Sequence, residues 1–151
     1  MPPADADVHA LRAEVYAASA DAEDPRTRLG REGEQIAARH LARHGYRILR
    51  RNFRARHGGE VDLVCRDVTE GVLVFVEVKT RTSEEHGSPA QAVNPAKQRL
   101  IVRGALEWMR LLDRPETPCR FDVVEVIVRP GQTPEIRVIR DAFPLPEPYL
   151  S

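Results

Sequence analysis

The spacing of apolar residues along the chain predicts two helices and five strands. Apolar positions recur at helical spacing over residues 30–44, and this helix ends at Gly45, a residue that favours a helix stop. The second helix opens at Asn94 and Pro95, an N-cap followed by proline at the first helical position. Its expected buried stripe has four members: Ile101, Ala105, Trp108 and Leu112.

Five other segments have the apolar and β-branched composition of strands. They are residues 46–53, 59–64, 74–79, 121–128 and 136–140. The order along the chain is therefore one helix, three strands, a second helix and two strands. This order predicts an α/β fold in which helices flank a mixed central sheet.

Three charged residues interrupt the apolar pattern of the second and third strands. A polar turn at residues 67–71 would place Asp62 directly opposite Glu77, with Lys79 on the same face of the hairpin. Two carboxylates this close repel each other unless one is protonated or a cation lies between them.

Oxygen ligands of this kind suit magnesium or manganese, and a neighbouring lysine could orient a water molecule or stabilise developing negative charge. The pattern therefore favours metal-assisted phosphodiester hydrolysis at Asp62, Glu77 and Lys79. The alternative is a structural ion pair on an exposed face of the sheet.

Two more acids are candidates for the same site, and Lys97 is a candidate for contact with nucleic acid. Glu34 heads the apolar stripe of the first helix, so it could reach the site or simply favour the helix N terminus. Glu60 shares a strand face with Asp62 and is a reserve ligand. Lys97 lies in the first turn of the second helix, where a cation is unfavourable unless an anion such as a phosphate is nearby; otherwise it is an exposed side chain. In the first helix, the apolar stripe that Glu34 heads consists of Ala37, Ala38 and Leu41.

The formal net charge of zero hides an uneven distribution. Residues 1–25 carry six acids and one base, so the rest of the chain has a net charge of +5, which is compatible with contact to nucleic acid. A basic cluster begins within the first strand, continues beyond it and could contact phosphates or be a solvated edge: Arg50, Arg51, Arg54 and Arg56. Of the 23 basic residues, only Lys79 and Lys97 are lysines, and a compact ammonium suits a position beside a metal better than arginine does.

The chain is expected to form one domain with two extensions. Residues 1–27 are predicted to be a mobile acidic arm, although an arm that competes with DNA for the basic face is the alternative. Residues 28–142 form the domain, and residues 143–151 form a proline-rich tail. No apolar run is long enough to span a membrane, and no secretory signal is evident. The two cysteines, Cys65 and Cys119, lack metal-ligand spacing and suit a reducing cytoplasm.

Several short motifs together resemble the YraN-like (UPF0102) family of bacterial proteins. The motifs lie at residues 30–34, 45–46, 52–54, 59–64, 75–81 and 87–93, together with Lys97. That family belongs to the restriction-endonuclease-like PD-(D/E)xK nuclease superfamily and is similar to archaeal Holliday-junction resolvases. The resemblance covers about residues 28–140 and implies the αβββαβ core of that superfamily, which agrees with the predicted order of elements.

The resemblance also implies roles for individual residues. Asp62 and Glu77 match the metal-binding acids, and Lys79 matches the lysine of the E-x-K element. Glu34 matches the acid that resolvases carry on their first helix, and the backbone carbonyl of Val78 matches a position that completes metal coordination. The proline that precedes the first acid in many members is absent here.

The expected function is therefore a metal-dependent endonuclease that uses Mg²⁺ or Mn²⁺ and acts on DNA, with branched or damaged DNA as the substrate in repair, recombination or uptake. The alternatives are a non-catalytic nucleic-acid-binding protein or a protein-interaction module on the same fold. Because resolvase-like relatives act as dimers, a homodimer is also expected, whereas the sequence identifies no protein partner and no membrane contact.

Overall fold

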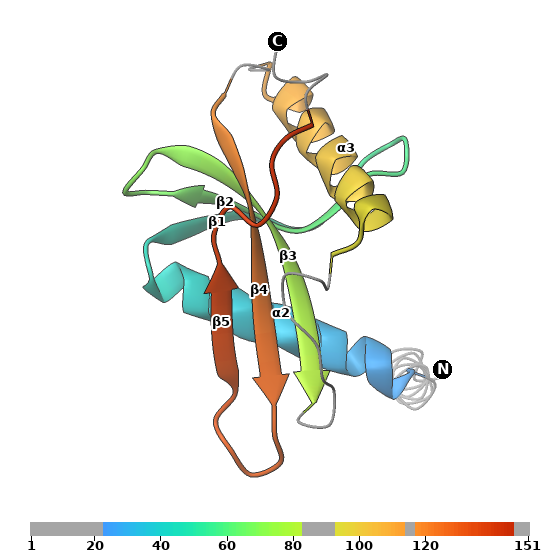
Figure 1. Ribbon diagram of the computed structural model, residues 1–151, viewed down its shortest axis with the longest axis vertical. Coiled ribbons are helices and arrows are strands. Elements are labelled where there is room, and N and C mark those ends of the chain that lie inside the picture. The colour runs from blue at the N-terminus through green and yellow to red at the C-terminus, as the bar shows by residue number, and fades with distance from the viewer. Residues whose placement is uncertain (1–22, 83–92, 114–116, 147–151) are drawn as a thin grey trace, which may run out of the picture.

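The computed structural model describes residues 23–82, 93–113 and 117–146, and these form a five-stranded sheet with two helices packed against it (Figure 1). The helices are α2 (Pro25–Arg43) and α3 (Pro95–Leu111). The strands are β1 (Tyr46–Arg54), β2 (Glu60–Asp67), β3 (Val72–Thr82), β4 (Cys119–Val128) and β5 (Glu135–Ile139). The predicted acidic arm up to residue 22, most of the polar loop after β3 and the end of the proline-rich tail lie outside the described residues.

The sheet is mixed, as the sequence predicted. Its strand order is β1-β2-β3-β4-β5, and the central pair β3 and β4 is parallel while every other neighbouring pair is antiparallel. A parallel pair requires a crossover connection, and α3 supplies the helix of that connection. This arrangement is the αβββαβ core of restriction-endonuclease-like proteins, extended by the edge strand β5.

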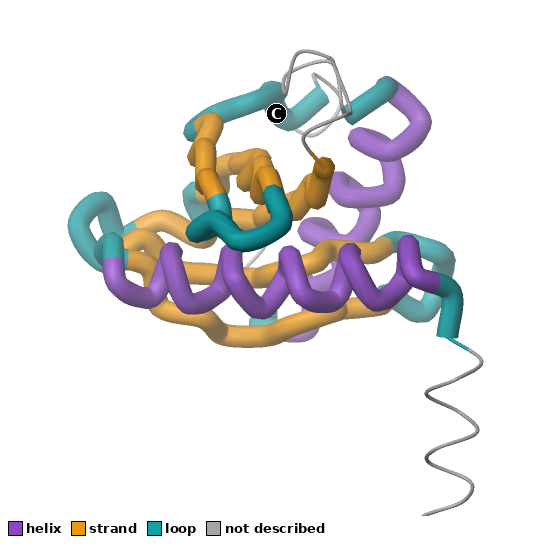
Figure 2. The backbone as a smooth tube through the Cα atoms, turned by 90° about the horizontal axis from the view of Figure 1, so that it is seen from below, coloured by secondary structure: helices purple, strands orange, loops and turns teal. Residues whose placement is uncertain are grey.

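Each face of the sheet packs against one helix. Alternate residues of β3 divide between two apolar clusters: Phe75 faces the cluster that contains Ile101 of α3, whereas Val76 faces the cluster that contains Leu41 of α2. Figure 2 shows α2 spanning the width of the strands, with α3 standing apart from it. Among the described residues, no helix is long and apolar enough to cross a membrane.

Helix α2 begins five residues earlier than the prediction that started it at residue 30. The Asp24 carboxylate caps the helix by accepting a hydrogen bond from the Arg26 N–H at 2.9 Å, and Pro25 occupies the first turn, where its missing N–H costs nothing. Residues 25–27, which were predicted to be the end of the mobile arm, are therefore the start of the helix. The predicted stop is confirmed, since Gly45 has a φ of 88°.

Helix α3 confirms the predicted N-cap but not the whole predicted stripe. The Asn94 side chain accepts a hydrogen bond from the Lys97 N–H at 2.9 Å, and Ile101 and Ala105 are fully buried. Leu112 was predicted to be buried and is 45% exposed, because the helix ends at Leu111 and Leu112 is its C-cap, outside the packed turns. The buried position in the last turns is Met109.

Candidate functional site

The hairpin of β2 and β3 brings Asp62 next to the Glu77 segment. The strand ladder ends with the pair Leu63 and Val76, so its register continues to Asp62 opposite Glu77. Beyond this pair, a side-chain hydrogen bond takes the place of the backbone hydrogen bonds between the strands: Asp62 Oδ2 accepts from the Val78 N–H at 2.8 Å. The turn that sets this register is fixed by Asp67, whose carboxylate accepts hydrogen bonds from two N–H groups of the turn, as an Asx turn does.

Glu77 is the most unusual residue of the hairpin. Its side chain is only 4% exposed, and its Oε2 is buried without a hydrogen-bond partner among the described residues. Its other oxygen, Oε1, lies 3.5 Å from the Lys79 Nζ and 3.8 Å from the Lys97 Nζ. Burial, and next the nearby charge of Asp62, raise the pKa of Glu77 to about 8.

The position of Lys97 predicted a nearby anion, and in the structure that anion is a carboxylate of the protein itself. Its ammonium donates a hydrogen bond to Glu60 Oε1 and also faces Glu77. Burial alone would lower the pKa of Lys97, but the hydrogen bond to Glu60 and the charge of Glu77 outweigh it and raise that pKa. The same hydrogen bond is the main reason why the pKa of Glu60 is lowered.

Glu60 is therefore an ion-pair partner in this structure. Besides Lys97 it faces Arg54, whose Nη1 lies 3.4 Å from Glu60 Oε2. The reserve-ligand hypothesis for Glu60 requires this carboxylate to exchange two cationic partners for a metal ion.

Glu34 lies on α2 but faces the same group of residues. Partial burial, and then the charge of Asp62, raise the pKa of Glu34, whereas a hydrogen bond with Asn52 acts in the opposite direction. The alternative that Glu34 favours the helix N terminus is wrong, because α2 begins nine residues earlier, at Pro25. The structure thus brings Glu34, Asp62, Glu77 and Lys79 to one end of the β2–β3 hairpin, with Lys97 beside them.

Two close backbone approaches hold the helices against this end of the hairpin. A Cβ added to Gly33 of α2 would lie 1.8 Å from Thr80 Oγ1 of β3, and a Cβ added to Gly59 would lie 2.4 Å from the Gly104 N of α3. Glycine at these positions lets α2 carry Glu34 and α3 carry Lys97 close to the strands.

Replacing Gly33 by alanine is expected to lower the free energy of unfolding by about 1 to 3 kcal/mol, because the new methyl group overlaps Thr80. Gly30→Ala in the same helix is the matched control, since nothing lies within 4 Å of an added Cβ there. That variant should gain about 0.5–1 kcal/mol from the better helix propensity of alanine. Urea unfolding of both variants measures the difference, and equal stabilisation of the two would contradict the close contact of α2 with β3.

The predicted phosphate contacts are exposed and lie on or next to the edge strand β1. Arg50, Arg51, Arg54 and Arg56 are all exposed. The Arg54 side chain, which is 79% exposed, reaches the ion pair with Glu60 and so connects this edge to the acid and lysine cluster. Whether the other three contact phosphates stays a prediction.

One buried acid near the site was not among the residues predicted from the sequence. Glu125 of β4 is 3% exposed, pairs in strand register with Lys79 and lies 3.5 Å from the Arg81 Nε through its Oε1. Its Oε2 is buried without a hydrogen-bond partner among the described residues. A charged residue within the apolar run at residues 121–128 was the available signal.

The donor set fits a hard divalent cation. Within the described part of the chain, no group of three or more His, Cys, Asp or Glu side chains is arranged to hold a metal. Magnesium requires fewer protein ligands than such a group provides, since it binds through one or two carboxylates and keeps several water ligands. The unpartnered Glu77 Oε2 beside Asp62 is the kind of buried oxygen that a cation would satisfy.

The order of helices and strands and the mixed sheet define a restriction-endonuclease-like fold. The family model described as "Uncharacterised protein family UPF0102" matches residues 33–126, a range that contains every candidate site residue. The chain belongs to this family.

Relatives in several bacteria support the assignment. A UPF0102 protein of Trichlorobacter lovleyi is 49% identical over 117 residues, covering 78% of this chain and 91% of that protein. The UPF0102 protein STH1475 of Symbiobacterium thermophilum is 49% identical over 116 residues, covering 77% and 96%. A UPF0102 protein of Chlorobaculum parvum is 52% identical over 99 residues, covering 66% and 74%.

Proposed function

We propose that this protein is a metal-dependent endonuclease that hydrolyses phosphodiester bonds of DNA, with branched or damaged DNA as its substrate. The observation that carries the proposal is the Glu77 carboxylate, buried next to Asp62 with one oxygen unpartnered. A buried acid held beside a second acid is unfavourable for the apo protein. The arrangement is typical of a site built for a cation, and functional sites often retain such unfavourable contacts.

The residues divide into metal-holding and chemical roles. Asp62, Glu77 and the backbone carbonyl of Val78 would hold Mg²⁺ or Mn²⁺, which supplies Lewis acidity and lowers the pKa of a bound water. Lys79, whose Nζ lies 3.5 Å from Glu77 Oε1, would orient the attacking water and stabilise negative charge on the phosphate. Glu34 would accept a proton from that water, a role that its raised pKa suits.

The charge around the site supports DNA as the substrate. Arg50, Arg51 and Arg56 are exposed on or next to β1, and their guanidinium groups would contact the phosphate backbone. Such binding should weaken steeply as salt concentration rises, whereas a protein-interaction module should have no affinity for DNA even at low salt.

The proposal is tested by titrating the purified protein with magnesium and manganese in a calorimeter, followed by cleavage assays on branched, flapped and linear DNA. Asp62→Asn should lose metal binding and reduce cleavage by more than about a hundredfold. Its fold should persist, because the asparagine oxygen can still accept the hydrogen bond from Val78. Asp113→Asn is the matched control, since Asp113 is exposed at the end of α3.

Cleavage retained by Asp62→Asn would refute the site. Salt-dependent DNA binding without metal binding or cleavage would identify a non-catalytic binding protein instead.

A further inference from the structure

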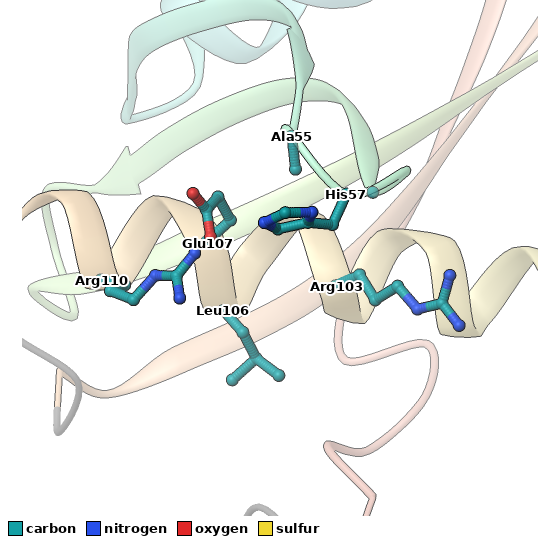
Figure 3. A pocket seen from close by; sticks show the side chains of 7 residues that line it. Ala55, His57, Arg103, Leu106, Glu107 and Arg110 are labelled. Atoms are coloured by element: carbon teal, nitrogen blue, oxygen red, sulfur yellow. Dashed lines mark hydrogen bonds and ion pairs between the residues drawn. The ribbon is translucent and has the colours of Figure 1, made fainter.

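A hollow of about 230 Å³ lies between the turn that joins β1 to β2 and the outer face of α3 (Figure 3). The turn contributes Ala55, His57 and Gly59, and the helix contributes Arg103, Leu106, Glu107 and Arg110. The roles assigned to Asp62, Glu77 and Lys79 do not use this hollow.

The walls of the hollow are held in place by the backbone. Gly59 sits directly on Gly104 of α3, so closely that an added Cβ would lie 2.4 Å from the Gly104 N. Within the turn, the Ala55 N–H donates to the Gly59 carbonyl at 2.7 Å, and the Gly58 N–H donates to the Ala55 carbonyl at 3.3 Å. The hollow is therefore preformed, which lowers the entropic cost of binding a ligand.

The lining combines apolar surface with one carboxylate. Ala55 and Leu106 are partly buried against the apolar core and supply the apolar walls. In Figure 3 the His57 ring extends from the turn over α3 toward Glu107 and Arg110. The Glu107 side chain is only 15% exposed and pairs through Oε2 with Arg110, whose side chain is 67% exposed.

This chemistry matches a nucleobase that carries an amino group. A flat ring can stack on an imidazole or a guanidinium and contact apolar side chains. A carboxylate oxygen accepts a hydrogen bond from an exocyclic amino group, as acidic side chains do with the amino group of cytosine. Arg110 Nη2 pairs with Glu107, and the other N–H groups of this exposed guanidinium can donate to the adjoining phosphate.

The hollow lies within reach of a strand bound at the proposed site. Lys97, which faces Glu77, is in the first turn of α3, and Glu107 follows ten residues later on the same helix. At about 1.5 Å of rise per residue the two positions are roughly 15 Å apart along the helix. That length corresponds to about four nucleotide steps of one DNA strand.

We propose that this hollow binds an unpaired, amino-bearing nucleobase of a DNA strand whose backbone crosses the site at Glu77. The inference rests on the proposed function and makes it more specific: it predicts a preference for DNA with unpaired nucleotides. A free nucleotide presents the same chemistry, so the experiment has to separate the two sources.

The test measures binding of fluorescent DNA at low salt in the presence of calcium. One duplex is fully paired, the second carries a single unpaired cytosine and the third carries a single unpaired thymine, which lacks the amino group. The wild type should bind the unpaired-cytosine duplex about tenfold more tightly than the paired one. His57→Ala should abolish this preference and Glu107→Gln should weaken it, because an amide oxygen accepts a hydrogen bond from the amino group less strongly than a carboxylate does. Both variants should change affinity for the paired duplex less than about twofold, and Glu107→Gln should leave thymine binding unchanged.

Matched controls are His44→Ala and Glu32→Gln, which alter exposed residues of the same types on or next to α2. The proposal is overturned if the wild type has no preference for the unpaired cytosine, or if the variants weaken binding to all three duplexes equally. In the second case the hollow contributes only general charge.

Failure of the proposed function gives a different pattern. If no duplex binds at all, nuclear magnetic resonance titration with deoxycytidine monophosphate tests whether the hollow binds a free nucleotide. Binding that depends on His57 and Glu107 would assign the hollow to a free nucleotide and overturn the strand-borne version. No binding would overturn the hollow as a nucleotide site. Cleavage of DNA without any effect of the two substitutions would leave the endonuclease standing and refute only the further inference.

Discussion

Replacing Glu77 by glutamine is expected to stabilise the protein increasingly as the pH rises from about 5 to about 8, by on the order of 3 to 4 kcal/mol over that interval. The reason is the pKa of Glu77, which burial raises from an ordinary 4.5 to about 8 in the folded protein. Between these two pH values the folded state binds more protons than the unfolded state. Wild-type stability therefore falls as the pH rises, and the glutamine variant lacks this loss.

Urea unfolding of the wild type and the variant at several pH values measures the effect. Glu60→Gln is the matched control in the same cluster, because the hydrogen bond from Lys97 lowers the pKa of Glu60. A lowered pKa stabilises the folded protein above pH values near 4.5 and loses that contribution in acid, so this variant should be less stable than wild type at neutral pH. A difference between Glu77→Gln and wild type that stays constant with pH would show that Glu77 titrates normally.

The same unfolding curves also examine the proposed metal site. A ligand that binds only the folded state stabilises it by about 2.7 kcal/mol at a hundred times its dissociation constant. Magnesium should therefore stabilise the wild type at pH 8, where Glu77 must bury a charge, and should have little effect on Glu77→Gln. An equal response of both proteins to magnesium would place the metal elsewhere.

The convergence of Asp62, Glu77 and Lys79 was predictable because it depends on local geometry. A hairpin with a short turn fixes its own register, and residues 67–71 carried the polar composition of such a turn. The ladder that pairs Leu63 with Val76 has the register assumed from the sequence. Strand alternation then placed Lys79 on the face of Glu77 without any information from the rest of the chain.

Contacts between distant segments could not be obtained in the same way. The position of Glu125 beside Lys79 depends on the parallel pairing of β3 and β4, two strands that are connected through α3. No turn fixes the register of such a pair. Lys97 shows an intermediate case: its place in the first turn of a helix predicted an anion, but the identity of that anion, Glu60, required the contact of α3 with the start of β2.

Replacing Arg120 by methionine is expected to lower the free energy of unfolding by about 3–5 kcal/mol, because it would leave the buried carboxylate of Asp122 without its cation. Arg120 lies two residues before Asp122 on β4, and Asp122 has no exposed surface. The guanidinium binds Asp122 in a bidentate manner, with Nε to Oδ1 and Nη2 to Oδ2 both at 2.9 Å. Its Nη1 also donates to Asp67 Oδ2 at 3.1 Å.

This network connects three of the five strands, and the residue that follows β5, on the face covered by α2. Tyr46 of β1 donates to Asp122 Oδ2 at 3.1 Å, and Asp67 ends β2. Beyond the end of β5, Arg140 donates to Asp67 Oδ2 at 3.1 Å. Burial and the neighbouring charge of Asp122 raise the pKa of Tyr46 to about 12, so its hydroxyl stays protonated as a donor. Loss of Arg120 therefore affects several strands at once.

Two further variants separate the buried charge from a general loss of contacts. Adding Asp122→Asn to Arg120→Met should recover part of the lost stability, since the uncompensated charge disappears while the oxygen still accepts from Asp141. Arg129→Met removes a partly exposed partner of Glu135 and should cost much less, because solvent screens this surface ion pair. Equal losses for Arg120→Met and Arg129→Met would mean that water compensates Asp122.

Metal binding by Arg120→Met provides the final discrimination between the two faces of the sheet. Asp122 alternates with Phe121 and Val123, which face α3, so its side chain points to the face opposite Glu77. The variant should therefore bind magnesium with unchanged affinity wherever it remains folded, although it is much less stable. A loss of stability with no loss of magnesium affinity would show that the Arg120 network holds the sheet together. It would also show that the acids on the other face, which cost stability, serve the bound cation.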